Sequence, residues 1–257
     1  MPETAPTILA LDFDGVLCDG LQEYFLTTWR TYCQVWQLAS QDPPDRIAPM
    51  FYRLRPVIET GWEMPLLLRA ILQGVPEEEI LLGWPEIAQQ LLKTENLQAA
   101  ELGPLLDKQR DRWISTDLAG WLGYHRFYPG VVERVRSLFE SPVEPVIITT
   151  KEERFVRKLL QQQGIEFSQG KIYGKGCKRP KYEILRELGG SVENIWFIED
   201  RLKTLQLVQQ QPDLEQVRLY LADWGYNTSS ERESVCNQER IKLLSLEQFV
   251  QDFSAWP

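Results

Sequence analysis

Five short apolar runs along the chain have the length and composition of buried β-strands. The runs are ILALD (8–12), PVIITT (145–150), KIYG (171–174), IWFIED (195–200) and VRLYLA (217–222). Between the later runs, apolar residues recur at helical spacing within residues 131–140, 155–160, 184–188 and 202–208. This alternation of strands and helices predicts an α/β fold built on a parallel sheet.

Residues 20–126 interrupt the alternation. They contain no convincing strand pattern, several helical stretches such as 23–36 and 77–93, and six of the nine tryptophans. Large aromatic side chains in a helical segment indicate a core of its own. We therefore predict an inserted helical domain over 20–126, bounded by turn residues on each side, and a main α/β domain formed by 1–19 and 127–257.

Polar residues stand at the carboxyl ends of three predicted strands. They are Asp12, Asp14, Thr149, Thr150, Glu199 and Asp200. Ligands of open parallel sheets bind beyond this edge, so the side chains are expected to converge there. Two acids at the end of a buried strand repel each other, which predicts a cation or a shared proton between them.

Each segment also has a purely structural interpretation. In this interpretation Asp14 merely ends the strand before Gly15, and the two threonines are ordinary strand residues with high strand propensity. Glu199 and Asp200 can simply begin a helix, where acids are favoured by the helix dipole. Their joint placement at strand ends is what favours a site for phosphoryl transfer.

Four segments resemble, in order, the motifs of the haloacid dehalogenase (HAD) superfamily. They are LDFDGV, VIITT, KRPKYEIL and WFIED. The helical insertion matches the position of the C1 cap of that superfamily, and the segments FIEDRLKTLQLV and LYLADWGYNT are similar to a poorly characterised branch of it. The resemblance implies a Rossmann-like core with a parallel sheet flanked by helices, plus an inserted α-helical cap domain.

Asp12 is the candidate nucleophile, because a carboxylate that attacks phosphorus divides hydrolysis into two easier steps through an aspartyl phosphate. Asp14 is the candidate acid and base, which protonates the leaving alcohol and later takes a proton from water. Mg²⁺ is the expected cofactor, since hard oxygen ligands suit it. Its expected ligands are Asp12, Asp200, Asp14 through its backbone carbonyl as the family implies, and Glu199 directly or through water.

Thr149 and Thr150 are the expected partners of the phosphoryl oxygens, together with a lysine that neutralises the developing charge. We predict Lys181 for this role because it opens the helix of residues 184–188. Lys178, in the glycine-rich segment before that helix, is the alternative, because the family also shows a lysine farther ahead of the helix.

Leaving-group recognition is expected from the cap, in the segment YRLRPVIETGWEM (52–64), which combines charged groups with a turn. The hypothesis is that Arg55 and Glu63 contact the leaving group. The alternative is a solvated helix edge with Trp62 buried in the cap core. His125 has no evident catalytic partner and is expected to be structural or on the surface.

Composition limits the classes of partner. The 257-residue chain has a formal charge of −9 and no basic patch, which argues against binding to nucleic acid or to an anionic membrane. No apolar run could span a bilayer, and no basic segment precedes the first apolar residues, so no export is expected. The four cysteines lack metal spacing and suit reduced thiols, which predicts a cytoplasmic location. The oligomeric state is left open.

The sequence thus predicts a Mg²⁺-dependent phosphohydrolase that acts on a small phosphorylated metabolite. A phosphomutase or phosphotransferase shares the same motifs, and a non-enzymatic regulatory or assembly protein could retain the fold. A dehalogenase is disfavoured, because the second aspartate of the first motif, Asp14, is absent from dehalogenases of the family.

Overall fold

The computed structural model describes residues 5–38, 42–190 and 194–257. The chain forms two compact units: an α/β unit of Met1–Asp19 and Arg126–Pro257, and a helical unit of Gly20–His125. The helical unit ends at His125, one residue before the limit of 126 that the sequence predicts. The reason is that Arg126 opens the short strand β3 (Arg126–Phe127), which pairs antiparallel with β2 (Cys18–Asp19) in the α/β unit.

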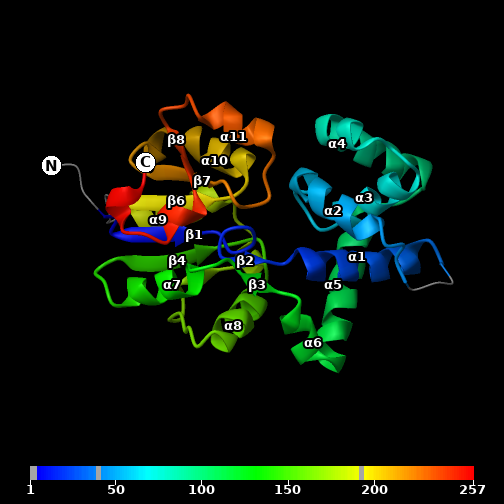
Figure 1. The fold of residues 1–257 in the computed structure, drawn as a ribbon, viewed down its shortest axis with the longest axis horizontal. Helices are drawn as coiled ribbons and strands as arrows, with labels where there is room; N and C mark the ends of the chain where they lie inside the picture. The colour runs from blue at the N-terminus through cyan, green and yellow to red at the C-terminus, as the bar shows by residue number, and fades with distance from the viewer. Residues whose placement is uncertain (1–4, 39–41, 191–193) are drawn as a thin grey trace. The chain divides into compact units, whose positions relative to one another are not determined.

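The α/β unit is built on a six-stranded parallel sheet in the order β5-β4-β1-β6-β7-β8 (Figure 1). The strands are β1 (Ile8–Leu11), β4 (Glu144–Ile148), β5 (Ile172–Tyr173), β6 (Ile195–Glu199), β7 (Arg218–Ala222) and β8 (Ile241–Leu244). Five of them match the predicted runs, which confirms the predicted fold class. The sixth, β8, was not predicted, because its IKLL pattern mixes buried and exposed positions at the edge of the sheet.

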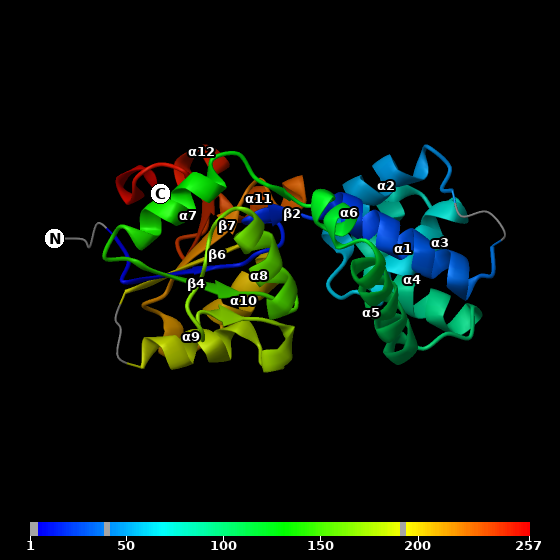
Figure 2. The ribbon, with the colours of Figure 1, turned by 90° about the horizontal axis from the view of Figure 1, so that it is seen from below.

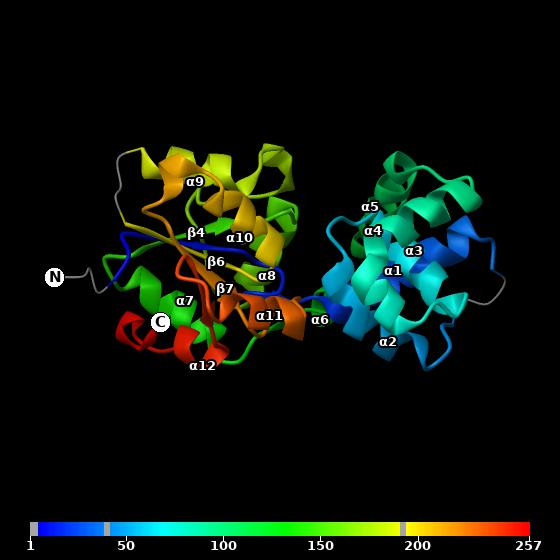
Figure 3. The same ribbon diagram turned by 90° about the horizontal axis from the view of Figure 1, so that it is seen from above.

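Helices cover both faces of this sheet, with α9 and α10 on one side and α7 and α12 on the other (Figures 2 and 3). The helices of the unit are α7 (Val131–Phe139), α8 (Glu153–Gln162), α9 (Lys181–Gly189), α10 (Leu202–Gln209), α11 (Ser229–Val235) and α12 (Leu246–Phe249), with the 3₁₀ turns η2 (Lys175–Cys177), η3 (Pro212–Leu214) and η4 (Phe253–Ala255). Ile184 of α9 and Leu205 of α10 pack into an aliphatic core with Phe197 of β6. On the other side, the ring of Trp196 of β6 packs against that of Trp256 in a tilted arrangement. Burial on both faces is typical of parallel sheets.

The helical unit contains α1 (Leu21–Val35), α2 (Ile47–Leu54), η1 (Arg55–Val57), α3 (Glu63–Leu72), α4 (Glu77–Thr94), α5 (Ala99–Thr116) and α6 (Leu118–Gly123). Helix α3 packs against α1, α2 and α4, and α1 also packs against α5. Helix α4 is kinked at Gly83, two residues before Pro85, because a proline inside a helix removes one backbone hydrogen bond. Among the described residues, none of the helices combines the length and the apolar character needed to cross a bilayer.

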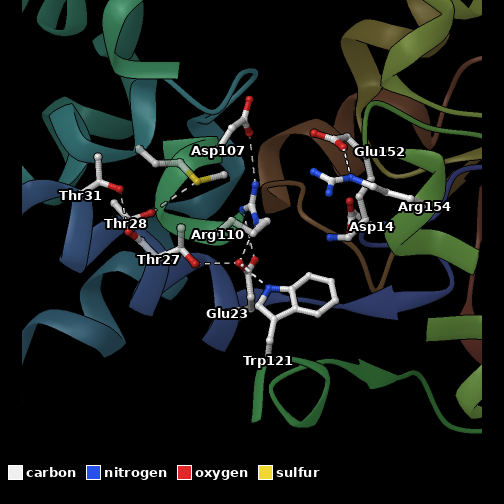
Figure 4. A network of polar contacts seen from close by, with 12 residues as sticks. Asp14, Glu23, Thr27, Thr28, Thr31, Asp107, Arg110, Trp121, Glu152 and Arg154 are labelled. Carbon is white, nitrogen blue, oxygen red and sulfur yellow. Dashed lines mark hydrogen bonds and ion pairs between the residues drawn. The ribbon is translucent and has the colours of Figure 1, made fainter. Parts of the chain in front are cut away.

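A buried ion pair lies inside the helical unit (Figure 4). Glu23 of α1 is fully buried and accepts hydrogen bonds from Arg110 Nε at 2.8 Å, Trp121 Nε1 at 3.1 Å and Thr27 Oγ1 at 2.7 Å. A buried carboxylate is tolerated only when it is paired and hydrogen-bonded in this way. The network therefore fixes α1, α5 and α6 to one another.

Candidate active site

The register of the sheet brings the predicted polar residues to one edge. Strand β1 lies between β4 and β6, and Leu11 is level with both Ile147 and Ile198. Asp12, the next residue, donates its backbone N–H to the Ile198 carbonyl at 2.9 Å. The side chains of Asp12, Glu199 and Asp200 are buried, and each offers an oxygen within 4.8 Å of the others. We call these three residues the acid cluster.

Lys181 contacts two members of the acid cluster. Its Nζ lies 2.6 Å from Asp12 Oδ1 and 2.7 Å from Glu199 Oε2. The lysine is the first residue of α9, and Pro180 before it takes the extended conformation that precedes a helix. Lys178 is exposed in the left-handed region, with φ 51°, and in the described part of the chain no ion pair joins it to the cluster.

Burial controls the electrostatics of the acid cluster. Burial raises the pKa of Asp12 to about 7, although the Lys181 ammonium opposes the shift. The pKa of Glu199 is raised to about 7 for the same reason. Burial alone lowers the pKa of Lys181, but the carboxylates of Asp12 and Glu199 outweigh this effect and raise it above its ordinary value. Three buried carboxyl groups stand together at this edge, so the acid cluster has the oxygen donors that could hold a divalent cation.

A loop after β7, residues 223–228, holds Asp200 in place. The backbone N–H of Tyr226 donates to Asp200 Oδ2 at 2.7 Å, and Asn227 Nδ2 donates to the Asp200 carbonyl at 2.9 Å. At Gly225 the loop approaches so closely that a Cβ atom would overlap the Asp200 side chain and lie 2.6 Å from the Gly15 carbonyl. Only glycine fits there, so the 223–228 loop orients one member of the acid cluster.

The same loop contacts the segment that follows Asp14. Trp224 Nε1 donates to the Val16 carbonyl at 3.1 Å, and the Tyr226 hydroxyl donates to Asp19 Oδ1 at 2.9 Å. Sequence reasoning did not assign a role to this loop. The available signal was its place, in the segment DWGYNT directly after a predicted strand.

The carboxyl end of β4 carries Thr149, Thr150 and Lys151. Thr149 is buried, and its Oγ1 accepts the backbone N–H of Lys151 at 3.1 Å. Thr150 is exposed, and no hydrogen bond joins its side chain to the acid cluster in the residues that the structure describes. Lys151, which sequence reasoning did not consider, is buried with its Nζ 3.0 Å from Asp14 Oδ1. The Asp14 side chain thus pairs with a lysine and is not a member of the acid cluster.

Arg55 and Glu63 have contacts within the helical unit. Arg55 Nη1 donates to the Ile58 carbonyl at 3.0 Å, and the guanidinium lies 5.3 Å from the centre of the Tyr24 ring. Glu63 Oε2 accepts the backbone N–H groups of Glu59 and Thr60, and its Oε1 accepts from Trp84 Nε1 at 3.1 Å. Glu63 therefore closes the turn that precedes α3 and joins it to α4, contacts that sequence reasoning did not foresee.

The remaining expectations about single residues concern His125 and the cysteines. His125 is buried, its Nδ1 lies 3.1 Å from the Trp121 carbonyl, and its ring packs against Trp121 in a tilted arrangement with centres 4.4 Å apart. All four cysteines are free thiols. Cys18 is fully buried beside the first motif, and burial raises its pKa well above the ordinary value of a thiol. A protonated, buried thiol is inert.

The fold and the acid cluster define a Rossmann-like hydrolase with an inserted helical unit. A family model described as hydrolase, haloacid dehalogenase-like hydrolase, matches residues 6–207. The chain belongs to this family. Hydrolases of the family generally use Mg²⁺, and the acid cluster has oxygen donors that suit such an ion.

Solved structures share the fold over nearly the whole chain. A predicted phosphatase from Clostridium acetobutylicum has 13% identity and a TM-score of 0.59, covering 95% of this chain and 96% of its own. A predicted phosphoglycolate phosphatase from Haemophilus somnus has 16% identity and a TM-score of 0.59, with coverages of 96% and 95%. A hydrolase from Pseudomonas syringae has 13% identity and a TM-score of 0.55, with 94% of each chain covered. No curated protein matches the chain.

Proposed function

We propose that the protein is a Mg²⁺-dependent phosphohydrolase that acts on a small phosphorylated metabolite through an aspartyl phosphate on Asp12. One observation carries the proposal: a buried aspartate at the end of the central strand contacts, at 2.6 Å, a lysine whose side chain is 12% exposed, and shares its site with two more acids. Similar folds that are described as phosphatases support this class of reaction. Membership of the hydrolase family supports water as the final acceptor.

Asp12 is proposed as the nucleophile. Its Oδ1 is held by Lys181, and this bond favours the ionised carboxylate that must attack phosphorus. When the Asp12–phosphorus bond forms and the bond to the leaving oxygen breaks, negative charge develops on the transferring group. Lys181 neutralises part of that charge, and the Thr149 hydroxyl, whose oxygen already accepts a hydrogen bond from Lys151, keeps its own hydrogen to donate.

Asp14 is proposed as the acid and base. It gives a proton to the leaving oxygen in the first step, and in the second step it takes a proton from the water that attacks the aspartyl phosphate. The side chain suits this role because it stands two residues from Asp12 and lies outside the acid cluster. Its carboxyl group is therefore not consumed by metal binding.

The proposed ligands of Mg²⁺ are Asp12, Asp200 and the backbone carbonyl of Asp14. The buried, oxygen-only donor set of the acid cluster fits this hard cation, which supplies charge stabilisation when bound. Glu199 already accepts hydrogen bonds at both oxygens, from Lys181 and from the backbone N–H of Arg201. We therefore assign Glu199 to a water-mediated contact.

The helical unit is proposed as the cap that selects the leaving group, with Arg55 and Glu63 as candidate contacts. Thr150, at the end of β4, is proposed as a further contact of the phosphoryl group. The proposed location is the cytoplasm. These assignments rest on the sequence pattern and on membership of the family.

The test is release of inorganic phosphate from 4-nitrophenyl phosphate and from a panel of phosphorylated metabolites, with Mg²⁺ and with excess chelator. We expect turnover only with the metal, and complete loss in Asp12→Asn with an unchanged circular dichroism spectrum. Turnover by Asp12→Asn would refute the nucleophile, and full activity in chelator would refute the metal. Transfer of phosphate to a second metabolite without release of free phosphate would identify a mutase or phosphotransferase instead.

A further inference from the structure

Asp14 and Lys151 form a buried ion pair between two neighbouring strand ends. The Lys151 Nζ lies 3.0 Å from Asp14 Oδ1, and the two side chains are only 6% and 14% exposed. The residues are 137 positions apart in the sequence. Asp14 follows β1 and Lys151 follows β4, which are adjacent in the sheet.

The backbone around Lys151 is fixed from two sides. Its N–H donates to Thr149 Oγ1 at 3.1 Å, and its carbonyl accepts the N–H of Lys175 at 2.9 Å. Gly174 makes this contact possible, because a Cβ there would lie 2.9 Å from the Lys151 carbonyl and 2.6 Å from the Glu153 nitrogen. With its backbone fixed and its side chain only 6% exposed, Lys151 has few positions available to its ammonium group.

A buried ion pair is a weak source of stability, because desolvation of both charges offsets their attraction. Stability alone therefore does not explain why a lysine is buried against the proposed acid and base. We propose that Lys151 is a positioning residue that fixes the orientation of the Asp14 carboxyl group. The inference rests on the proposed function and adds to it a residue that the family motifs did not indicate.

Lys151 donates to Oδ1, so Oδ2 is the atom that carries the transferred proton. In the first step the Asp12 oxygen bonds to phosphorus, the bond from phosphorus to the leaving oxygen breaks, and the proton on Oδ2 of Asp14 moves to that oxygen. In the second step the water oxygen bonds to phosphorus, the bond from the Asp12 oxygen to phosphorus breaks, and Oδ2 regains a proton from that water. Lys151 can keep its hydrogen bond to Oδ1 in both steps, because a carboxyl oxygen accepts whether or not the other oxygen is protonated.

The test is a series of para-substituted phenyl phosphates, which differ in leaving-group basicity but hardly in size. The value of kcat/KM reports the first step, and 4-nitrophenolate leaves without needing a proton, whereas 4-methylphenolate needs one. We expect Lys151→Met to lower kcat/KM for 4-methylphenyl phosphate about 10-fold to 100-fold more than for 4-nitrophenyl phosphate, because a misplaced acid loses much of its contribution. Lys151→Arg, which keeps a donor, should recover part of this loss.

Two further variants separate positioning from general damage. Lys158→Met, on the exposed side of α8, should leave both substrates unaffected. In an Asp14→Asn background, Lys151→Met should cause no more than about a 2-fold further change, because residues that act through one another are not additive. This double variant leaves neither charge unpaired, so it gives a result even when the single variant fails to fold.

Equal losses on both substrates in Lys151→Met, or a large further loss in the Asp14→Asn background, would overturn the inference and assign Lys151 to the phosphoryl group or to stability. Phosphate release by the wild-type protein distinguishes failure of this inference from failure of the proposed function. A wild-type protein that releases no phosphate from any substrate refutes the phosphohydrolase itself and the role of Lys151 with it.

Discussion

Lys181 and Asp12 are 169 residues apart in the sequence, yet their side chains meet at 2.6 Å between the first turn of α9 and the end of β1. The contact exists because β1 and β6 are adjacent in the sheet and α9 is the element that precedes β6 in the chain. Lys181 also contacts Glu199, the last residue of β6. One helix start therefore supplies the cation for two strand ends.

The first prediction concerns the two candidate lysines. Lys181→Ala should lower kcat/KM on 4-nitrophenyl phosphate by about 10²-fold to 10³-fold, the usual effect of removing one donor to a developing negative charge. Lys178→Ala should retain activity, since Lys178 is exposed.

Removal of Lys181 leaves buried carboxylates unpaired, so the melting temperature must be measured alongside. Lys181→Arg keeps the charge, and we expect it to fold but to remain poorly active because a planar guanidinium does not replace an ammonium at two carboxylates. Normal turnover in both Lys181 variants, with loss in Lys178→Ala, would reverse the assignment.

The second prediction concerns the 223–228 loop and metal affinity. Gly225→Ala places a methyl group against Asp200 and the Gly15 carbonyl, so Asp200 must shift. Disturbed partners of a metal ligand typically weaken metal binding about 10-fold to 100-fold. Isothermal titration with Mg²⁺, in the absence of substrate, measures this directly.

The matched control is Gly176→Ala, because a Cβ at Gly176 meets no atom within 4 Å. It should bind Mg²⁺ as the wild type does. Unchanged affinity in Gly225→Ala would show that Asp200 does not depend on the loop for its orientation, or that it is not a ligand.

The third prediction is a pH dependence inside the helical unit. Burial alone raises the pKa of Glu95, but hydrogen bonds from Trp36 and Arg69 outweigh it and lower the pKa below its ordinary value of 4.5. A carboxyl with a lowered pKa stabilises the folded state above pH 4.5, and this stabilisation is lost as the pH falls through the lowered value.

Glu95→Gln should therefore reduce the free energy of unfolding by about 1 kcal/mol at neutral pH, and the difference from wild type should shrink in acid. Urea unfolding at neutral pH and below pH 4.5 measures it. Glu101→Gln on the exposed side of α5 is the control, for which no difference is expected at either pH. A difference that stays constant with pH would contradict the assignment.

The fourth prediction separates Arg55 from Glu63. Glu63→Ala leaves Trp84 Nε1 and two backbone N–H groups without their acceptor, so we expect the helical unit to lose about 1–3 kcal/mol of stability. Arg55→Ala should instead raise KM or lower kcat for the physiological substrate and barely change the hydrolysis of 4-nitrophenyl phosphate. Equal effects of Arg55→Ala on both substrates would remove it from leaving-group recognition.

The sequence was most informative where local pattern decides structure. The runs at 8–12 and 195–200 became β1 and β6, because an apolar run that ends in acids is readable from the residues alone. Two-residue strands such as β2 and β3 carry no such pattern, so the pairing of Asp19 with Arg126 could not be predicted.

Contacts between residues far apart in the sequence limit how much of the site can be predicted from the sequence. Nothing in the local sequence indicates that the Tyr226 backbone binds Asp200, 26 residues away, or that Lys151 meets Asp14. Glu63 stays a predicted substrate contact, and the hydrogen bonds that it accepts from the Glu59 backbone and from Trp84 could not be predicted from its charge near a turn. The type of a residue indicates what it can bind, and the fold decides which partner it meets.

The pairing of Asp19 with Arg126 in β2 and β3 also bears on how such proteins diversify. Because these two residues are cross-strand neighbours, residues 20–125 leave the α/β unit and return to it at the same place. An insertion whose ends already touch places no demand on the length or shape of what lies between them. The paired strands β2 and β3 therefore form an insertion point. There, one helical module can be exchanged for another, or for a tight turn, while every strand pairing of the sheet is kept.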